Sequence, residues 1–74
     1  MVVAIVLIQV KAKTAEQVVT ALGKTDHVEK VHMVTGPYDI IAYADIPSRG
    51  DFRKFVNSIH DIDGVLRTET CVEL

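Results

Sequence analysis

Four segments of the chain carry the dense apolar patterns that are typical of strands. They are Val2 to Val10, Val28 to Thr35, Tyr38 to Ile46 and Val65 to Leu74. The first segment is apolar at almost every position, and the Val and Ile residues that fill most of it favour strands. A tight turn at Gly36-Pro37 separates the second segment from the third. In the last segment the even-numbered residues are expected to share one face.

Two segments between these strands have the spacing of amphipathic helices. Thr14 to Leu22 has a narrow apolar stripe, its first residue and Gln17 are spaced as a capping box, and Gly23 is placed to end the helix. The second helix is predicted to begin at Ser48, with Asp51 three residues later. Its apolar side chains recur at the spacing of one buried face, at Phe52, Phe55, Val56 and Ile59.

The order of these elements is βαββαβ, two strand–helix–strand halves joined by a short turn. Right-handed crossovers fold such a chain into a ferredoxin-like α+β sandwich, a four-stranded antiparallel sheet with both helices on one face. In that arrangement the first and third strands, which are the most apolar, form the central pair. A chain of 74 residues is too short for two domains, so residues 1–74 are predicted to form one.

The two central strands are apolar on both faces, although no helix is expected to cover one of them. One face of the first strand carries Val2, Ala4, Val6 and Ile8 and the other Val3, Ile5 and Leu7, and the third strand has Ile40, Ala42 and Ala44 opposite Ile41 and Tyr43. An apolar sheet face of several hundred Å² is rarely left exposed on a monomer. We therefore predict that a second copy covers it, sheet against sheet, as in a dimeric α/β barrel.

Composition and charge exclude several other classes. With 49% hydrophobic residues and a net charge of −2, the chain is not expected to be disordered. Its eight basic and ten acidic residues are interspersed and form no basic stripe, so direct DNA binding is not expected. The apolar opening is half of the about 20 residues that a membrane span needs. It also lacks the basic start of a signal peptide, so we expect a cytoplasmic protein without a membrane partner.

The candidate metal ligands and nucleophiles do not cluster in the sequence. His27, His32 and His60 show no ligand spacing and Cys71 stands alone, so no metal, no other cofactor and no disulfide is predicted. Cys71 lies within a strand and is interpreted as structural, which leaves no catalytic residue. One enzymatic alternative stays open, a small dimeric α/β-barrel enzyme with a pocket inside the dimer. His32 is its best titratable candidate, provided that it faces the space between the sheets.

Polar groups suited to a small zwitterion gather around the turn between the second and third strands. A turn at Gly36 leaves backbone N–H groups unshielded, and these can meet a carboxylate. Asp39 can accept from an ammonium group and Tyr38 can supply an amphipathic wall, while Thr68 and Thr70 offer hydroxyls. Taken alone, these residues fit an ordinary hairpin turn, with Asp39 bonding nearby amides, better than they fit a ligand site.

The segments Val34 to Ile41 and Gly64 to Thr70 resemble those of a known family. They are similar to the C-terminal effector-binding domain of Lrp/AsnC (feast/famine) transcriptional regulators, also called the RAM domain. The resemblance covers essentially the whole chain in order. It implies dimers that pair through their sheets and assemble into rings, commonly octamers, with effectors, usually amino acids, bound in clefts between dimers.

The resemblance also implies residues of the effector site. The candidate ligand-binding residues are Gly36, Pro37, Tyr38, Asp39, Thr68 and Thr70. Full-length members carry an N-terminal helix-turn-helix, whereas here Met1 leads directly into the first strand. The expected function is therefore that of a stand-alone, non-enzymatic sensor of an amino acid or related metabolite. It would act through assembly with itself or with a full-length Lrp/AsnC regulator.

Overall fold

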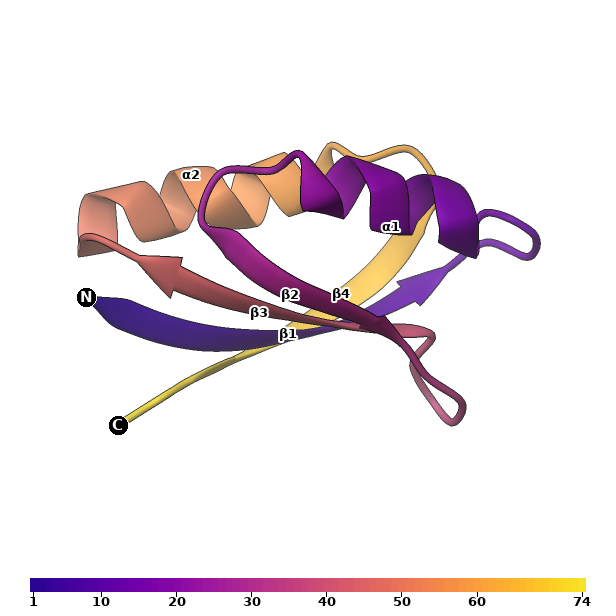
Figure 1. Ribbon diagram of the computed structural model, residues 1–74, viewed down its shortest axis with the longest axis horizontal. Coiled ribbons are helices and arrows are strands. Elements are labelled where there is room, and N and C mark those ends of the chain that lie inside the picture. Colours follow the sequence, from indigo (N-terminus) through magenta and orange to yellow (C-terminus); the bar gives the residue numbers. More distant parts are fainter.

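The structure, a computed structural model, describes all 74 residues and has the predicted βαββαβ order. Its elements are β1 (Val2–Val10), α1 (Ala15–Gly23), β2 (Val28–Met33), β3 (Ile40–Ile46), α2 (Arg49–His60) and β4 (Val65–Val72). The four strands form one antiparallel sheet in the order β2-β3-β1-β4. Both helices cover the same face of this sheet, and the other face carries no element (Figure 1). The ferredoxin-like sandwich, with β1 and β3 at its centre, is confirmed.

The hydrophobic core lies between the sheet and the two helices. In β1 and β3 the even-numbered residues face the helices in matched pairs, as with Val6 opposite Ala42 and Ile8 opposite Ile40. From the helices, the buried side chains are those of Val18, Leu22, Phe55 and Ile59. Burial of a large apolar side chain contributes about 1.5–3 kcal/mol, so this layer of buried side chains is a major source of stability.

The two helices begin differently. At α2 the Ser48 hydroxyl accepts a hydrogen bond from the Asp51 N–H at 3.3 Å and donates to its carboxylate at 2.9 Å, which confirms the predicted start. At α1 the Thr14 hydroxyl donates instead to the Lys11 carbonyl at 2.7 Å and caps no helix N–H, so the predicted capping box is wrong. Gly23 is the last helical residue, and the chain leaves in a right-handed conformation, so it is not a left-handed stop.

The connection between β2 and β3 is longer than the sequence predicts. β2 ends at Met33 and β3 begins at Ile40, so Tyr38 and Asp39 lie in the turn and not in the strand. The turn is closed by a hydrogen bond of 2.9 Å from the Val34 N–H to the Asp39 carbonyl. Gly36 has φ +127°, a value that residues with a side chain rarely adopt. The chain therefore reverses direction at Gly36, before β3 begins to pair with β2.

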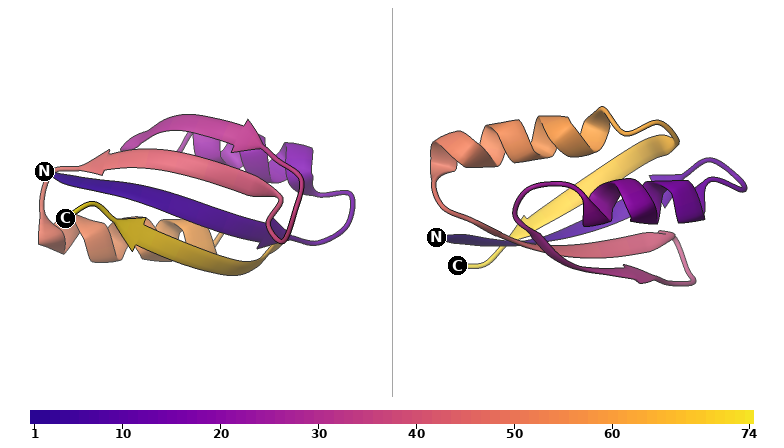
Figure 2. Two further views of the ribbon diagram at one scale, coloured as in Figure 1. Left: turned by 90° about the horizontal axis from the view of Figure 1, so that it is seen from below. Right: turned by 45° about the horizontal axis from the view of Figure 1, so that its top comes forward.

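The chain termini and the turn between β2 and β3 lie at opposite ends of the sheet (Figure 2).

Neither α1 nor α2 has the length and apolar character needed to cross a membrane.

Candidate functional site

The turn Val34–Asp39 presents backbone donors that the protein does not use. The N–H groups of Gly36 and Tyr38 donate to no other backbone group. A Cβ built on Gly36 would meet nothing within 4 Å, so the backbone is open to solvent at this point. Such unshielded N–H groups can receive an anion. The turn thus offers the donors that a ligand carboxylate requires.

Asp39 connects the turn to the neighbouring central strand. Its Oδ2 accepts a hydrogen bond of 2.9 Å from the Val10 N–H, and its own N–H donates to the Ile8 carbonyl at 2.9 Å. The other carboxylate oxygen, Oδ1, accepts no hydrogen bond from the protein. Asp39 is half-buried, and it therefore combines a structural bond with one free acceptor.

Tyr38 lies beside a residue that the sequence analysis did not select. Partial desolvation raises the pKa of the Tyr38 hydroxyl above its ordinary value of 10.0, and hydrogen bonding to Glu69 and the negative charge of that residue raise it further. Glu69 is opposite Leu7 in the sheet, so it belongs to the face without helices. The alternation of residues along β4 is a sequence signal that puts Glu69 on the opposite face from Thr68 and Thr70. It does not reveal that Glu69 is near Tyr38, because that depends on the register between the strands.

The two candidate threonines lie on the other side of the sheet from Glu69. Thr70 pairs with Val6 and Thr68 with Ile8, both of which face the helices. The Thr68 hydroxyl is 2.9 Å from His60 Nε2, at the end of α2. The structure therefore brings the four turn residues together, but it does not bring the threonines to the side of the sheet where Tyr38 meets Glu69.

The sheet face without helices, here called the open face, is seen from below in the left view of Figure 2. The register and burial of β1 and β3 place one of the two apolar sets on it, Val3, Ile5, Leu7, Ile41 and Tyr43. Val3, Ile5 and Tyr43 remain 38%, 37% and 39% exposed. The chain exposes 5055 Å² in total, against about 4,500 Å² for a compact monomer of its mass. His32 also lies here, with its ring 6.0 Å from that of Tyr43 in a T-shaped contact.

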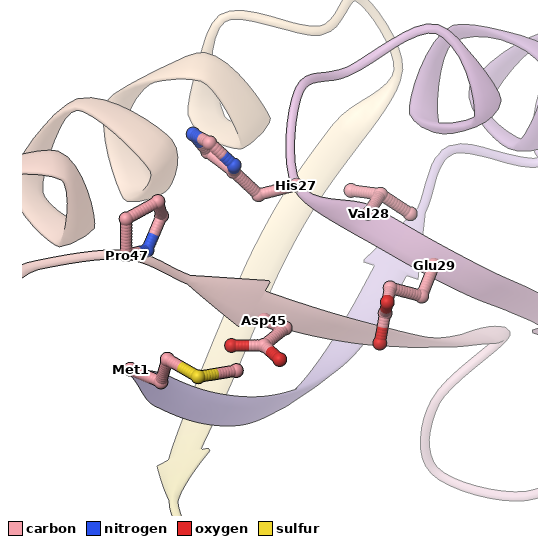
Figure 3. Close-up of a pocket in the computed structure, with 6 residues that line it drawn as sticks. All are labelled: Met1, His27, Val28, Glu29, Asp45 and Pro47. Carbon is pink, nitrogen blue, oxygen red and sulfur yellow. The ribbon is translucent and has the colours of Figure 1, made fainter.

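Three hollows of the surface lie away from the turn and from the His32–Tyr43 contact. One, of about 450 Å³, is lined by Met1, His27, Val28, Glu29, Asp45 and Pro47. Figure 3 shows the His27 ring directed away from the carboxylates of Glu29 and Asp45. No group of three or more His, Cys, Asp or Glu side chains is arranged to hold a metal ion. His32 thus meets the positional condition of the barrel-enzyme alternative, but it lines none of these three hollows.

The fold and its turn define a small ferredoxin-like domain with one bare sheet face and an uncovered glycine turn. Residues 3–74 match the Lrp/AsnC ligand binding domain, and the chain belongs to this family.

Known proteins similar to this chain include transcriptional regulators of about twice its length. An uncharacterized HTH-type transcriptional regulator of Pyrococcus furiosus is 39% identical over 71 residues, which are 96% of this chain and 48% of the relative. The chain therefore spans about half the length of the curated relatives it matches.

Two solved structures show the same relationship. AsnC of Escherichia coli superposes with a TM-score of 0.90 at 27% identity, covering 99% of this chain and 50% of AsnC. A transcriptional regulator of Neisseria meningitidis, solved in complex with L-Met, has a TM-score of 0.86 over 99% of this chain and 49% of its own. Its identity is 21%, so this second likeness concerns the fold alone.

Proposed function

We propose that this chain is a sensing module that binds an amino acid, or a related small metabolite, at the turn Gly36, Pro37, Tyr38 and Asp39. The observation that carries the proposal is the pairing of free donors with a free acceptor. The Gly36 and Tyr38 N–H groups would receive the ligand carboxylate, and Asp39 Oδ1 would accept from its ammonium group. The relative solved with L-Met is a member of the same fold class, which agrees with a ligand of this kind.

The proposed site is completed by another subunit. The backbone at Gly36 is open to solvent, and none of the three hollows described above includes a turn residue, so the turn by itself does not cover a ligand. A ligand site of ordinary kind is concave and buries most of its ligand. In this proposal a neighbouring dimer supplies the missing wall, and ligand binding therefore shifts the equilibrium between dimers and larger rings such as octamers.

The dimer itself is proposed to form through the open face. A stable interface buries about 800 Å² on each partner, and the apolar residues of β1 and β3 on this face form a continuous centre for it. The rim carries charged side chains, among them Lys30, Arg67 and Glu69. This is the usual arrangement of an apolar interface core with a polar edge.

Thr68 and Thr70 have a supporting role in this proposal. Thr68 joins β4 to the end of α2 through His60, and both threonines lie on the helix side of the sheet. The output is proposed to be regulatory: assembly with itself, or with a full-length Lrp/AsnC regulator that carries the DNA-binding part, would transmit the presence of the ligand.

Native mass spectrometry tests the proposal directly. The purified protein is measured with and without a mixture of the twenty amino acids. We expect a dimer or a larger ring that gains the mass of particular amino acids. Asp39→Asn should remove the ligand bound at the turn, one per chain, while retaining an acceptor for the Val10 N–H, and Glu16→Gln, on the exposed side of α1, serves as the charge-matched control. A plain monomer, or an Asp39→Asn protein that binds like the original, would contradict the proposal.

A further inference from the structure

A groove at the terminal end of the sheet is not explained by the turn site. It has a volume of about 490 Å³ and is lined by Met1, Val2, Arg49, Phe52, Val72 and Glu73. These residues come from the start of β1, the first turn of α2 and the end of β4. Figure 1 shows these three segments at the same end of the molecule, opposite to the turn between β2 and β3.

The groove lies at the edge of the core and exposes apolar surface to solvent. Val72 pairs with the fully buried Ala4 on the helix side of the sheet, yet it is 47% exposed. Phe52 lies on the apolar stripe of α2 but is only half-buried, whereas Phe55, one turn further on, is 2% exposed. Protein interiors are normally close-packed. Phe52 packs against the core with one side, and its remaining surface forms with Val72 an apolar wall that is open to solvent.

The charged residues of this groove also lack partners. Arg49 and Glu73 both line it, and neither makes a salt bridge, since the single salt bridge of the chain joins Arg67 to Glu69. Neither side chain takes part in a hydrogen bond within the protein. The Glu73 backbone is held in place, because its N–H donates to the Val3 carbonyl at 2.9 Å. One groove thus combines an unpaired cation, an unpaired anion and a bare apolar wall.

We propose that this groove binds a free α-amino acid with a large apolar side chain, such as leucine. The Arg49 guanidinium would pair with the ligand carboxylate and the Glu73 carboxylate with its ammonium group, both by charge-assisted hydrogen bonds. The ligand side chain would cover Phe52 and Val72. The volume lies within the range of about 300–1,000 Å³ found for small-molecule sites. This site lies within one chain and does not depend on the proposed site at Gly36–Asp39.

The test is a titration of the isotope-labelled protein with L-leucine, followed by the backbone amide resonances. Saturable shifts are expected at Val2, Phe52 and Val72. The keto acid of leucine keeps the carboxylate and lacks the ammonium group, so it should bind about tenfold more weakly. Shifts confined to the turn residues, no saturable shift, or equal affinity for the two ligands would overturn the proposal. So would shifts that follow protein concentration, which would indicate a second copy seated in the groove.

Variants separate this site from the turn. Arg49→Gln should weaken L-leucine binding at the groove by about tenfold, and Glu73→Gln should remove the preference for leucine over its keto acid. Arg53→Gln, an exposed position of α2 outside the groove, is the matched control and should bind as the original does. Asp39→Asn should leave the groove shifts unchanged even where it abolishes binding at the turn. Unchanged binding in Arg49→Gln would refute the assignment.

Discussion

The side chain of Asp39 holds the backbone of Val10, a residue 29 positions earlier in the chain, through a hydrogen bond of 2.9 Å from the Val10 N–H to Asp39 Oδ2. β3 begins only at Ile40, opposite Ile8, so at Val10 the Asp39 carboxylate takes the place of a strand carbonyl as the acceptor. Val10 is 9% exposed, and water has little access to replace the bond. The geometry of the turn and the pairing of β1 are therefore coupled through one side chain.

Asp39→Ala is expected to lower stability, whereas Asp39→Asn is expected to retain most of it. Alanine leaves the Val10 N–H without a partner, which costs about 1–3 kcal/mol, while the asparagine carbonyl oxygen can still accept. Urea unfolding at one fixed protein concentration measures both variants, because an oligomer changes its apparent stability with concentration. Equal stability of the alanine variant and the original would show that the bond contributes nothing.

Gly64→Ala is expected to destabilise the fold through a direct clash. Gly64 is buried with φ +103°, and an added Cβ would lie 2.8 Å from Thr14 Oγ1 and 3.2 Å from Val18 Cγ2. Overpacking of this kind typically costs about 1–3 kcal/mol, and the left-handed backbone adds strain. Gly23→Ala is the control, since its Cβ would meet nothing within 4 Å. It lies in α1, where alanine is favoured by up to about 1 kcal/mol, so its melting temperature should rise or stay the same.

The fold could be predicted because its strongest signals are local and agree with one another. The dense apolar segments and the helical stripe of α2 gave the element order, and that order permits few topologies. The errors came from competing hydrogen bonds. The Thr14 hydroxyl donates to the Lys11 carbonyl and caps no helix N–H. Asp39 lies before β3, where its carboxylate accepts a hydrogen bond from the Val10 N–H. Such choices depend on neighbours that the local pattern does not contain.

The site could be predicted only in part, since its composition depends on which side of the sheet each residue faces. The turn residues are contiguous, so the sequence places them together. Thr68 and Glu69 are adjacent in the chain, yet one lies on the helix side and the other on the open face. Only the register of β1 with β4 and the path of the turn bring Glu69, and not Thr68, to Tyr38. The terminal groove joins three distant segments and has no local signature.

Ile5→Lys is expected to break the proposed dimer without unfolding the chain. Ile5 lies at the centre of the open face between Tyr43 and Cys71, and a buried lysine there would face the partner's apolar surface. Sedimentation should then show a species near the single-chain mass of 8.2 kDa. Met33→Lys adds the same charge at an exposed apolar residue paired with the inward-facing Ile40, so the dimer should persist.

A chemical probe gives a second readout of the same prediction. Cys71 is the only cysteine and is exposed in the single chain, on the open face opposite Ile5. If the faces pair, a maleimide should modify Cys71 slowly in the original protein and rapidly in Ile5→Lys. Equal rates in both proteins, with both at the single-chain mass, would exclude the open face as an interface.

Tyr38 is expected to ionise above pH 10. Desolvation and the neighbouring Glu69 raise its pKa from 10.0, so the folded protein favours the neutral phenol. Its contribution to stability is therefore complete below the unfolded value of about 10 and is lost as the pH rises through the raised pKa. The chain has two tyrosines and no tryptophan, so tyrosinate absorbance in a Tyr43→Phe background reports Tyr38 alone. Adding Glu69→Gln should lower the midpoint towards 10 without fully restoring it, because desolvation is the larger cause. A titration midpoint that is unchanged by Glu69→Gln would mean that the side chains of Tyr38 and residue 69 do not interact.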